Sequence, residues 1–454
     1  MAKKYAYWLD SGKYSMMQKL SMVLFGILTF MLLARIFTPQ KFGIWGLFII
    51  ISSIVEMLRH ALIKNGYILF INTCKEIEKS AYEYSALLAN CVFSAVLCVF
   101  FFFTGNLFES LFNSPGIAIV LKYYSVTLLF LVPFTQREFF LLARMNFKGI
   151  FFMYFLRNGL FMLVSVFLYI TKTDIYLGNL AIIYGASALV GVLIGFSIGK
   201  YQKIDFTWNY SIFLKFLNYG RFILGTNFFA LIFRNTDSFM TARFISPIGL
   251  AFYNSASRVI NFAEMPVLVF SEMMLPKAAH IIRTGNETNL KYMYEKTVSA
   301  ILTLIIPFII ITWIFAEQII LILAGSQYLE ASSVLRVMVF YAFFLPFTSQ
   351  FGNLMDSTGR QRINFRVMLI FAVINIGSNY YFISEFGLLG AAFGTLFTYC
   401  LLFIVIQTIL VKHAKVSHLN ILRNIISLYP EYFKLILQML NKFSRAGRGF
   451  SAKI

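Results

Sequence analysis

Twelve apolar segments account for most of this 454-residue chain, and each is as long as the roughly 20 residues that a helix needs to cross a bilayer. The first half contains the segments 16–37, 42–63, 84–104, 117–140, 150–170 and 177–199. The second half contains 220–244, 248–270, 293–315, 332–354, 366–384 and 387–411. The connections between them are short and leave no room for an extramembrane catalytic domain. The pattern predicts an all-α polytopic membrane protein with about 12 transmembrane helices.

The composition supports a lipid environment. Hydrophobic residues make up 59% of the chain and charged residues only 13%, whereas soluble domains carry about 25% charged residues. The net charge of +20 arises from short basic clusters between apolar runs, which favours membrane topology over nucleic-acid binding. Cys74, Cys91, Cys98 and Cys400 have no CxxC spacing, so neither a metal site nor a disulfide framework is predicted.

The positive residues also predict the orientation, because Lys and Arg are retained on the cytoplasmic side. They occur before the first segment and in alternate connections, at Lys3, Lys4, Lys13, Lys19, Lys75, Lys79, Arg144, Lys148, Lys200, Lys203, Lys277, Arg283, Lys291, Arg360, Arg362 and Arg366. Both termini are therefore predicted to be cytoplasmic. Arg35, Lys41, Lys172 and Arg243 fall on the opposite side and are exceptions to this rule.

An internal repeat divides the chain. ARIFTP at 34–39 matches ARFISP at 242–247, and PFTQ at 133–136, MNFK at 145–148 and LG at 177 recur in the same order as PFTSQ, INFR and LG. Each copy has six spans, an even number, so the copies are predicted to be parallel repeats. We expect six-helix bundles at 1–203 and 204–416. The remaining residues, 417–454, have an apolar helical face that predicts a cytoplasmic amphipathic tail on the inner leaflet.

Charged residues inside the predicted spans are the candidate functional residues, since a charge at mid-membrane costs roughly 2.5–3.5 kcal/mol. Arg234, Asp237, Arg258 and Glu264 lie in the seventh and eighth spans. The second span carries Ser52, Glu56, Arg59 and His60 at helical spacing. Polar stripes of this kind would line a hydrophilic, partly cationic cavity. Two alternatives remain open: Arg234 and Asp237 form a structural ion pair, and Arg35 and Arg243 only extend to the membrane surface.

Enzyme motifs are not found. The chain has no Gly-rich phosphate loop, no GxSxG and no HExxH sequence, so neither a catalytic residue nor a cofactor is predicted. Without an ATP site, transport would have to use an ion gradient, the membrane potential or the substrate's own gradient.

Three stretches carry a resemblance to a known family: LLARIFTPQKFGIWGL, RNTDSFMTARFISPIGLAFYNSASRVINFAEMP, and NLMDSTGRQRINF followed by FGLLGAAFGTLFTY. The chain resembles the polysaccharide-biosynthesis branch, the Wzx-type O-antigen flippases, of the multidrug/oligosaccharidyl-lipid/polysaccharide exporter superfamily. The resemblance implies a V-shaped pair of six-helix bundles in the bacterial inner membrane. It also implies movement of undecaprenyl-pyrophosphate-linked oligosaccharide between leaflets by alternating access.

This resemblance assigns roles to the polar residues. Substrate binding is expected of Arg234, Arg258, Asn254, Asn261, Arg59 and Arg35. Coupling or gating is expected of Glu56, Glu264 and Asp237. Expected partners are the lipid-linked oligosaccharide, membrane lipids, and the polysaccharide polymerase and chain-length machinery. The alternative is a cation-coupled multidrug or metabolite exporter of the same superfamily, whose smaller pocket would be more apolar and acidic. A glycan polymerase or ligase is disfavoured by the short outer connections.

Overall fold

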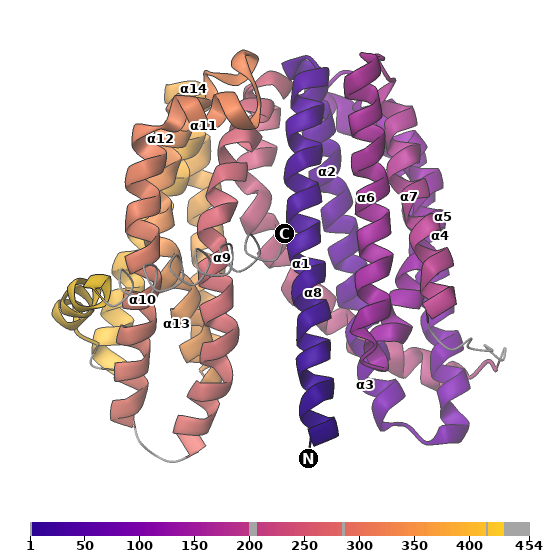
Figure 1. Cartoon of the computed structure of the whole chain (residues 1–454), viewed down its shortest axis with the longest axis horizontal. Coiled ribbons are helices and arrows are strands. Elements are labelled where there is room, and N and C mark those ends of the chain that lie inside the picture. Colours follow the sequence, from indigo (N-terminus) through magenta and orange to yellow (C-terminus); the bar gives the residue numbers. More distant parts are fainter. Residues whose placement is uncertain (1, 199–206, 284–286, 359, 415, 431–454) are drawn as a thin grey trace, which may run out of the picture. The chain divides into compact units, whose positions relative to one another are not determined.

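The computed structural model describes residues 2–198, 207–283, 287–358, 360–414 and 416–430. For 2–12, 222–223, 225–233, 272–283, 287–289 and 413–414 it describes the backbone alone. Across these ranges the chain is helical and contains no strand, which confirms the all-α fold class (Figure 1). Nine helices within the searched residues are long and apolar enough to cross a membrane. Two further long helices, α8 (Tyr210–Phe244) and α9 (Pro247–Arg283), cover the seventh and eighth predicted spans.

The chain packs as two compact units, and the first comprises Met1–Asn254 with Ile320–Leu329. Its helices are α1 (Ala2–Ile36), α2 (Pro39–Arg59), η1 (His60–Lys64), α3 (Asn65–Thr73), α4 (Glu76–Leu111), α5 (Ile117–Ala143), α6 (Phe147–Thr171), α7 (Leu177–Ile198) and α8. In this unit α5 packs against α4 and α7, and α6 packs against α1 and α7. Helix α8 packs against α2, α4 and η1.

The turn between α1 and α2 is built by its sequence. Thr38 caps α2 by accepting a hydrogen bond from the Lys41 N–H, and Pro39 occupies the first turn, where its missing N–H costs nothing. In the repeated motif Pro247 likewise begins α9. The two helix starts meet closely, because a Cβ added to Gly43 would lie 1.7 Å from the Pro247 carbonyl oxygen. Glycine at this position lets the two backbones touch.

The second unit comprises Ser255–Ile319 and Glu330–Ile454. It contains the rest of α9 with α10 (Glu287–Ile314), α12 (Ala331–Met338), η3 (Val339–Phe344), α13 (Leu345–Ser357) and α14 (Gln361–Ala414). The short α11 (Ala316–Leu323) has its first residues assigned to the second unit and its last to the first, and η2 (Ser326–Tyr328) belongs to the first. The core of the second unit joins α10, α13 and α14 through Tyr294, Leu302, Phe351, Leu402 and Ile406, among others.

Three predicted spans differ in detail from the observed helices. The eleventh and twelfth spans form one run, α14, interrupted only at Gly387, whose φ of 57° is a conformation that glycine adopts readily. The tenth span is divided into α12, η3 and α13. The predicted boundary at 203/204 lies outside the described residues and stays a prediction. In the tail, residues 418–430 are helical and bury Ile421 and Ile425 in the core of the second unit; residues 431–454 are not described.

Candidate functional site

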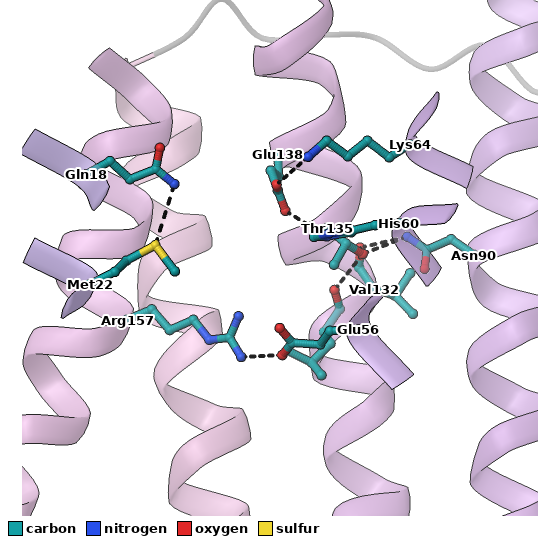
Figure 2. Close-up of polar contacts among 11 residues, drawn as sticks. Gln18, Met22, Glu56, His60, Lys64, Asn90, Val132, Thr135, Glu138 and Arg157 are labelled. Carbon is teal, nitrogen blue, oxygen red and sulfur yellow. Dashed lines mark hydrogen bonds and ion pairs between the residues drawn. The ribbon is translucent and has the colours of Figure 1, made fainter. Parts of the chain in front are cut away.

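Charged side chains gather inside the first unit, among α2, η1, α5 and α6 (Figure 2). Arg157 of α6 is 4% exposed, and its Nη2 donates to Glu56 Oε1 on α2 over 2.5 Å. The same nitrogen lies 3.4 Å from the Tyr184 hydroxyl on α7. The guanidinium also lies over the Phe134 ring, 5.0 Å from its centroid. Burial of this arginine is therefore offset by one carboxylate, one hydroxyl and an aromatic face.

A second charged cluster surrounds Glu138 on α5, which is 3% exposed. His60 Nε2 lies 3.4 Å from one of its carboxylate oxygens, and Lys64 Nζ lies 4.0 Å from the other (Figure 2). His60 and Lys64 are the first and last residues of η1, a π-helical turn between α2 and α3. Such turns are rare and frequently occur at functional sites. The turn brings both basic groups to the same carboxylate.

Arg59 differs from Arg157, because its buried charge forms no ion pair with any described residue. The side chain is 0% exposed, and its Nη2 donates to Ser94 Oγ on α4 over 3.1 Å. Its Nε and Nη1 have no hydrogen-bond acceptor, and no carboxylate lies within 4.0 Å of it in the described part of the chain. With Glu56 and Glu138 as the acids and Arg59, Arg157 and the half-buried Lys64 as the bases, this charged layer has an excess of one positive charge, which Lys64 supplies.

The layer contains three of the residues that the sequence identified, Glu56, Arg59 and His60. Arg157, Glu138 and Lys64 were not identified. Arg157 and Glu138 lie within the predicted spans 150–170 and 117–140. A charged residue inside a predicted span, the criterion that identified Arg234 and Arg258, would therefore have identified them as well. The pairing of residues about a hundred positions apart left no local pattern in the sequence.

The other predicted site residues of the first unit have different surroundings. Arg35 is exposed and donates to the carbonyl oxygens of Met31, at 3.2 Å, and Ile322, at 2.6 Å. Arg234 is also exposed. Asp237 accepts a hydrogen bond from the Tyr253 hydroxyl over 3.0 Å. Asn254 is half-buried and packs on α2, where a Cβ at Gly46 would lie 2.5 Å from its Nδ2.

The remaining predicted residues belong to the second unit and lie on α9. Arg258 and Glu264 are half-buried, and Asn261 is exposed. The predicted substrate-binding and coupling sets are thus divided between the two units, and their roles stay predictions. Among the described residues, no group of three or more His, Cys, Asp and Glu side chains is arranged to hold a metal ion.

These features define a polytopic helical membrane protein whose first unit encloses a net positive charged layer. Residues 32–333 match the family model described as polysaccharide biosynthesis protein. Because the match covers more than half of the sequence, the chain belongs to this family. It is also 27% identical over 241 residues to an uncharacterised membrane protein of Methanocaldococcus jannaschii. That alignment covers 52% of this chain and 48% of the archaeal protein, so the chain spans about half the length of this curated relative.

Solved structures share the fold at low sequence identity. The lipid II flippase MurJ, in an inward closed conformation, superimposes with a TM-score of 0.73 at 15% identity, over 94% of this chain and 92% of MurJ. An inward-facing multidrug transporter of the MATE family of the MOP superfamily superimposes with a TM-score of 0.70 at 14% identity, over 87% of this chain and 96% of the transporter. A MOP superfamily transporter from Pyrococcus furiosus superimposes with a TM-score of 0.58 at 13% identity, over 90% of this chain and 96% of that transporter.

Proposed function

We propose that this protein is a flippase for a lipid-linked oligosaccharide. The substrate would be undecaprenyl-pyrophosphate-linked oligosaccharide, an O-antigen or related surface-polysaccharide repeat unit. It would move from the cytoplasmic to the outer leaflet of the bacterial inner membrane, with both protein termini cytoplasmic. The observation that carries the proposal is the fully buried Arg59, which has no carboxylate within 4.0 Å among the described residues, in a member of the polysaccharide biosynthesis family.

The chemistry of the substrate requires such a charge. A pyrophosphate leaving water needs cationic hydrogen-bond donors, and these bonds strengthen in a medium of low dielectric constant. Arg59 has two nitrogens, Nε and Nη1, without an acceptor and no ion-paired carboxylate among the described residues, so it would supply this chemistry. Arg157 is neutralised by Glu56, and exchange of that carboxylate for phosphate would release Glu56 during the cycle. Substrate would therefore favour the conformation in which phosphate has replaced Glu56 on Arg157, because a ligand shifts the population toward the state that binds it more tightly.

The residues predicted from the sequence complete the proposal. Arg234 and Arg258 would contact the phosphates in one of the two access states, with Arg35 nearer the outer surface. Asn254 and Asn261 would contact the sugars, and Glu264 and Asp237 would titrate or change partners. A polysaccharide polymerase and the chain-length machinery would receive the flipped repeat unit.

A multidrug or metabolite exporter is the second candidate, since multidrug transporters share the fold. An exporter of cationic compounds would need an acidic pocket, whereas the charged layer of the first unit is positive. The charge therefore favours an anionic substrate.

The test is the sidedness of the lipid-linked oligosaccharide in cells that lack this protein. We expect the lipid to accumulate on the cytoplasmic face and the wild-type protein to relieve this accumulation. Arg59→Met, Arg234→Ala and Arg258→Ala should fail, whereas Lys148→Ala, which removes an exposed charge at the start of α6, should succeed. Normal sidedness without the protein would exclude the flippase and favour the exporter.

A further inference from the structure

The positive residues that contradict the topology rule are not scattered. Of the four exceptions, Arg35, Lys41 and Lys172 line one pocket of the first unit, with a volume of about 530 Å³. The fourth, Arg243, instead donates to the Ser110 carbonyl oxygen and contacts Asn113. Lys and Arg are normally depleted on the outer side of a membrane, so the positive-inside rule does not account for three of them around one pocket. A binding role would account for them.

The pocket is formed by the α1–α2 turn and by the end of α6 with the connection that follows it. Its lining consists of Arg35, Ile36, Thr38, Lys41, Tyr169, Ile170, Lys172, Thr173 and Asp174. Three of these side chains are cationic and one is acidic, so the lining has an excess of positive charge. The N-terminus of α2, capped by Thr38, adds its partial positive charge.

The three cations are held to different degrees. Arg35 is fixed by the carbonyl oxygens of Met31 and Ile322, and a guanidinium so held keeps further N–H donors. Lys41 is 2.7 Å from both carboxylate oxygens of Asp174. Lys172 is exposed and makes no hydrogen bond or ion pair within the described residues. The pocket thus contains one fixed, one neutralised and one available positive group.

Part of the pocket lining is apolar. Tyr169 and Ile170, in the last turn of α6, are 46% and 73% exposed. Tyrosine at the end of a membrane helix is typical of the level of the lipid headgroups. The pocket therefore offers positive charge beside an apolar surface, which is the complement of an amphiphile with an anionic head.

We propose that this pocket binds the phosphate headgroup of a lipid in the outer leaflet, with the hydrocarbon chain along Tyr169 and Ile170. The inference rests on the proposed function for the orientation in the membrane and shares Arg35 with it, but neither Arg59 nor Arg157 lines the pocket. Two sources share this chemistry: an anionic phospholipid resident in the membrane, and a polyprenyl phosphate carrier.

The experiment is native mass spectrometry of the purified full-length protein in detergent. The probes are phosphatidylglycerol, a polyprenyl phosphate, zwitterionic phosphatidylcholine, and inorganic phosphate. Lys172→Gln should weaken binding of the two anionic lipids about fivefold, the effect of one surface cation on an anionic lipid. Asp174→Asn releases Lys41 and should strengthen binding by a similar factor. Lys148→Gln, at the other end of α6, is the matched control and should change nothing.

Each outcome decides the proposal. Binding of phosphatidylglycerol alone would identify a resident lipid, and binding of polyprenyl phosphate alone would identify the carrier; both support the pocket. Equal binding of phosphatidylcholine would overturn it, as would binding of inorganic phosphate with no preference for lipid. The proposal also fails if Lys172→Gln and Asp174→Asn do not change lipid binding in opposite directions. A general loss of folding would weaken binding in both variants and could not produce opposite effects. None of these results bears on the sidedness test.

Discussion

Arg157 of α6 and Glu56 of α2 form an ion pair of 2.5 Å across the first unit, although 101 residues separate them in the sequence. A pair of this kind holds two helices together only while both charges are present, because either charge alone is left buried without a partner. The pair is also a candidate for rearrangement, since a phosphate could replace the carboxylate.

Removing one partner should therefore cost more than removing both. We expect Glu56→Gln and Arg157→Met each to lower the free energy of unfolding by about 3 kcal/mol, and the double variant to lose less than either single variant. The measurement is denaturant unfolding in detergent, analysed as a double-mutant cycle. Additive losses would mean that the two side chains do not interact.

Removing the charge of Arg59, unlike removing that of Arg157, should not destabilise the protein, because Arg59 forms no ion pair with a described residue. Replacing a buried charge with an apolar side chain of similar length is often neutral or stabilising, so Arg59→Met should unfold no more easily than the wild type. If Arg59 binds phosphate, the same variant should lose oligosaccharide transport. Ser94→Ala removes its acceptor on α4 and should lower the free energy of unfolding by about 1–3 kcal/mol. Transport retained by Arg59→Met would remove Arg59 from the substrate site.

The sequence was sufficient for the fold class because long apolar runs permit few alternatives. It also identified Glu56, Arg59 and His60, since charged and titratable residues in such a run stand out. It could not identify the partners of these residues. The contacts of Glu56 with Arg157 and of His60 with Glu138 join helices whose packing depends on the whole bundle. The π-helical turn that orients His60 and Lys64 likewise has no sequence pattern that distinguishes it from an α-helix.

Gly43 is expected to tolerate no side chain. A Cβ there would lie 1.7 Å from the Pro247 carbonyl oxygen, a backbone atom that cannot move without α9. Gly43→Ala should lower the free energy of unfolding by at least about 1–3 kcal/mol, the usual cost of overpacking. Gly26→Ala is the control, because nothing lies within 4 Å of its added Cβ, and alanine should stabilise α1 by about 0.5–1 kcal/mol. Thermal unfolding of both variants checks the prediction, and equal shifts would contradict it.

Tyr328 buries a hydroxyl that has no hydrogen-bond partner in the described part of the chain, and its ring contacts the rings of Phe42 and Phe252. Tyr328→Phe removes this unsatisfied group and should raise the free energy of unfolding by roughly 1 kcal/mol.

The same tyrosine predicts a dependence on pH, because burial raises the pKa of its phenol. Above pH of about 10 the unfolded chain loses this proton while the folded protein keeps it, so stability falls as the pH rises. Tyr328→Phe should lose less stability than the wild type between neutral and strongly alkaline pH. Tyr176→Phe, at an exposed tyrosine, is the control and should follow the wild type. Identical alkaline profiles for all three proteins would contradict the burial argument.

The orientation in the membrane can be tested at the two ends of α6. This helix has 25 residues, and at about 1.5 Å per residue it is longer than the bilayer core of about 30 Å. Lys148 lies in its first turn and Lys172 directly follows its last residue, so the two should face opposite compartments. With the four native cysteines replaced by serine, Lys172→Cys should react with an impermeant maleimide in intact cells. Lys148→Cys should react only after the membrane is permeabilised.

The reverse labelling pattern would place both termini outside and would move the Lys172 pocket to the inner leaflet. Labelling of both sites from outside would mean that α6 does not span the membrane.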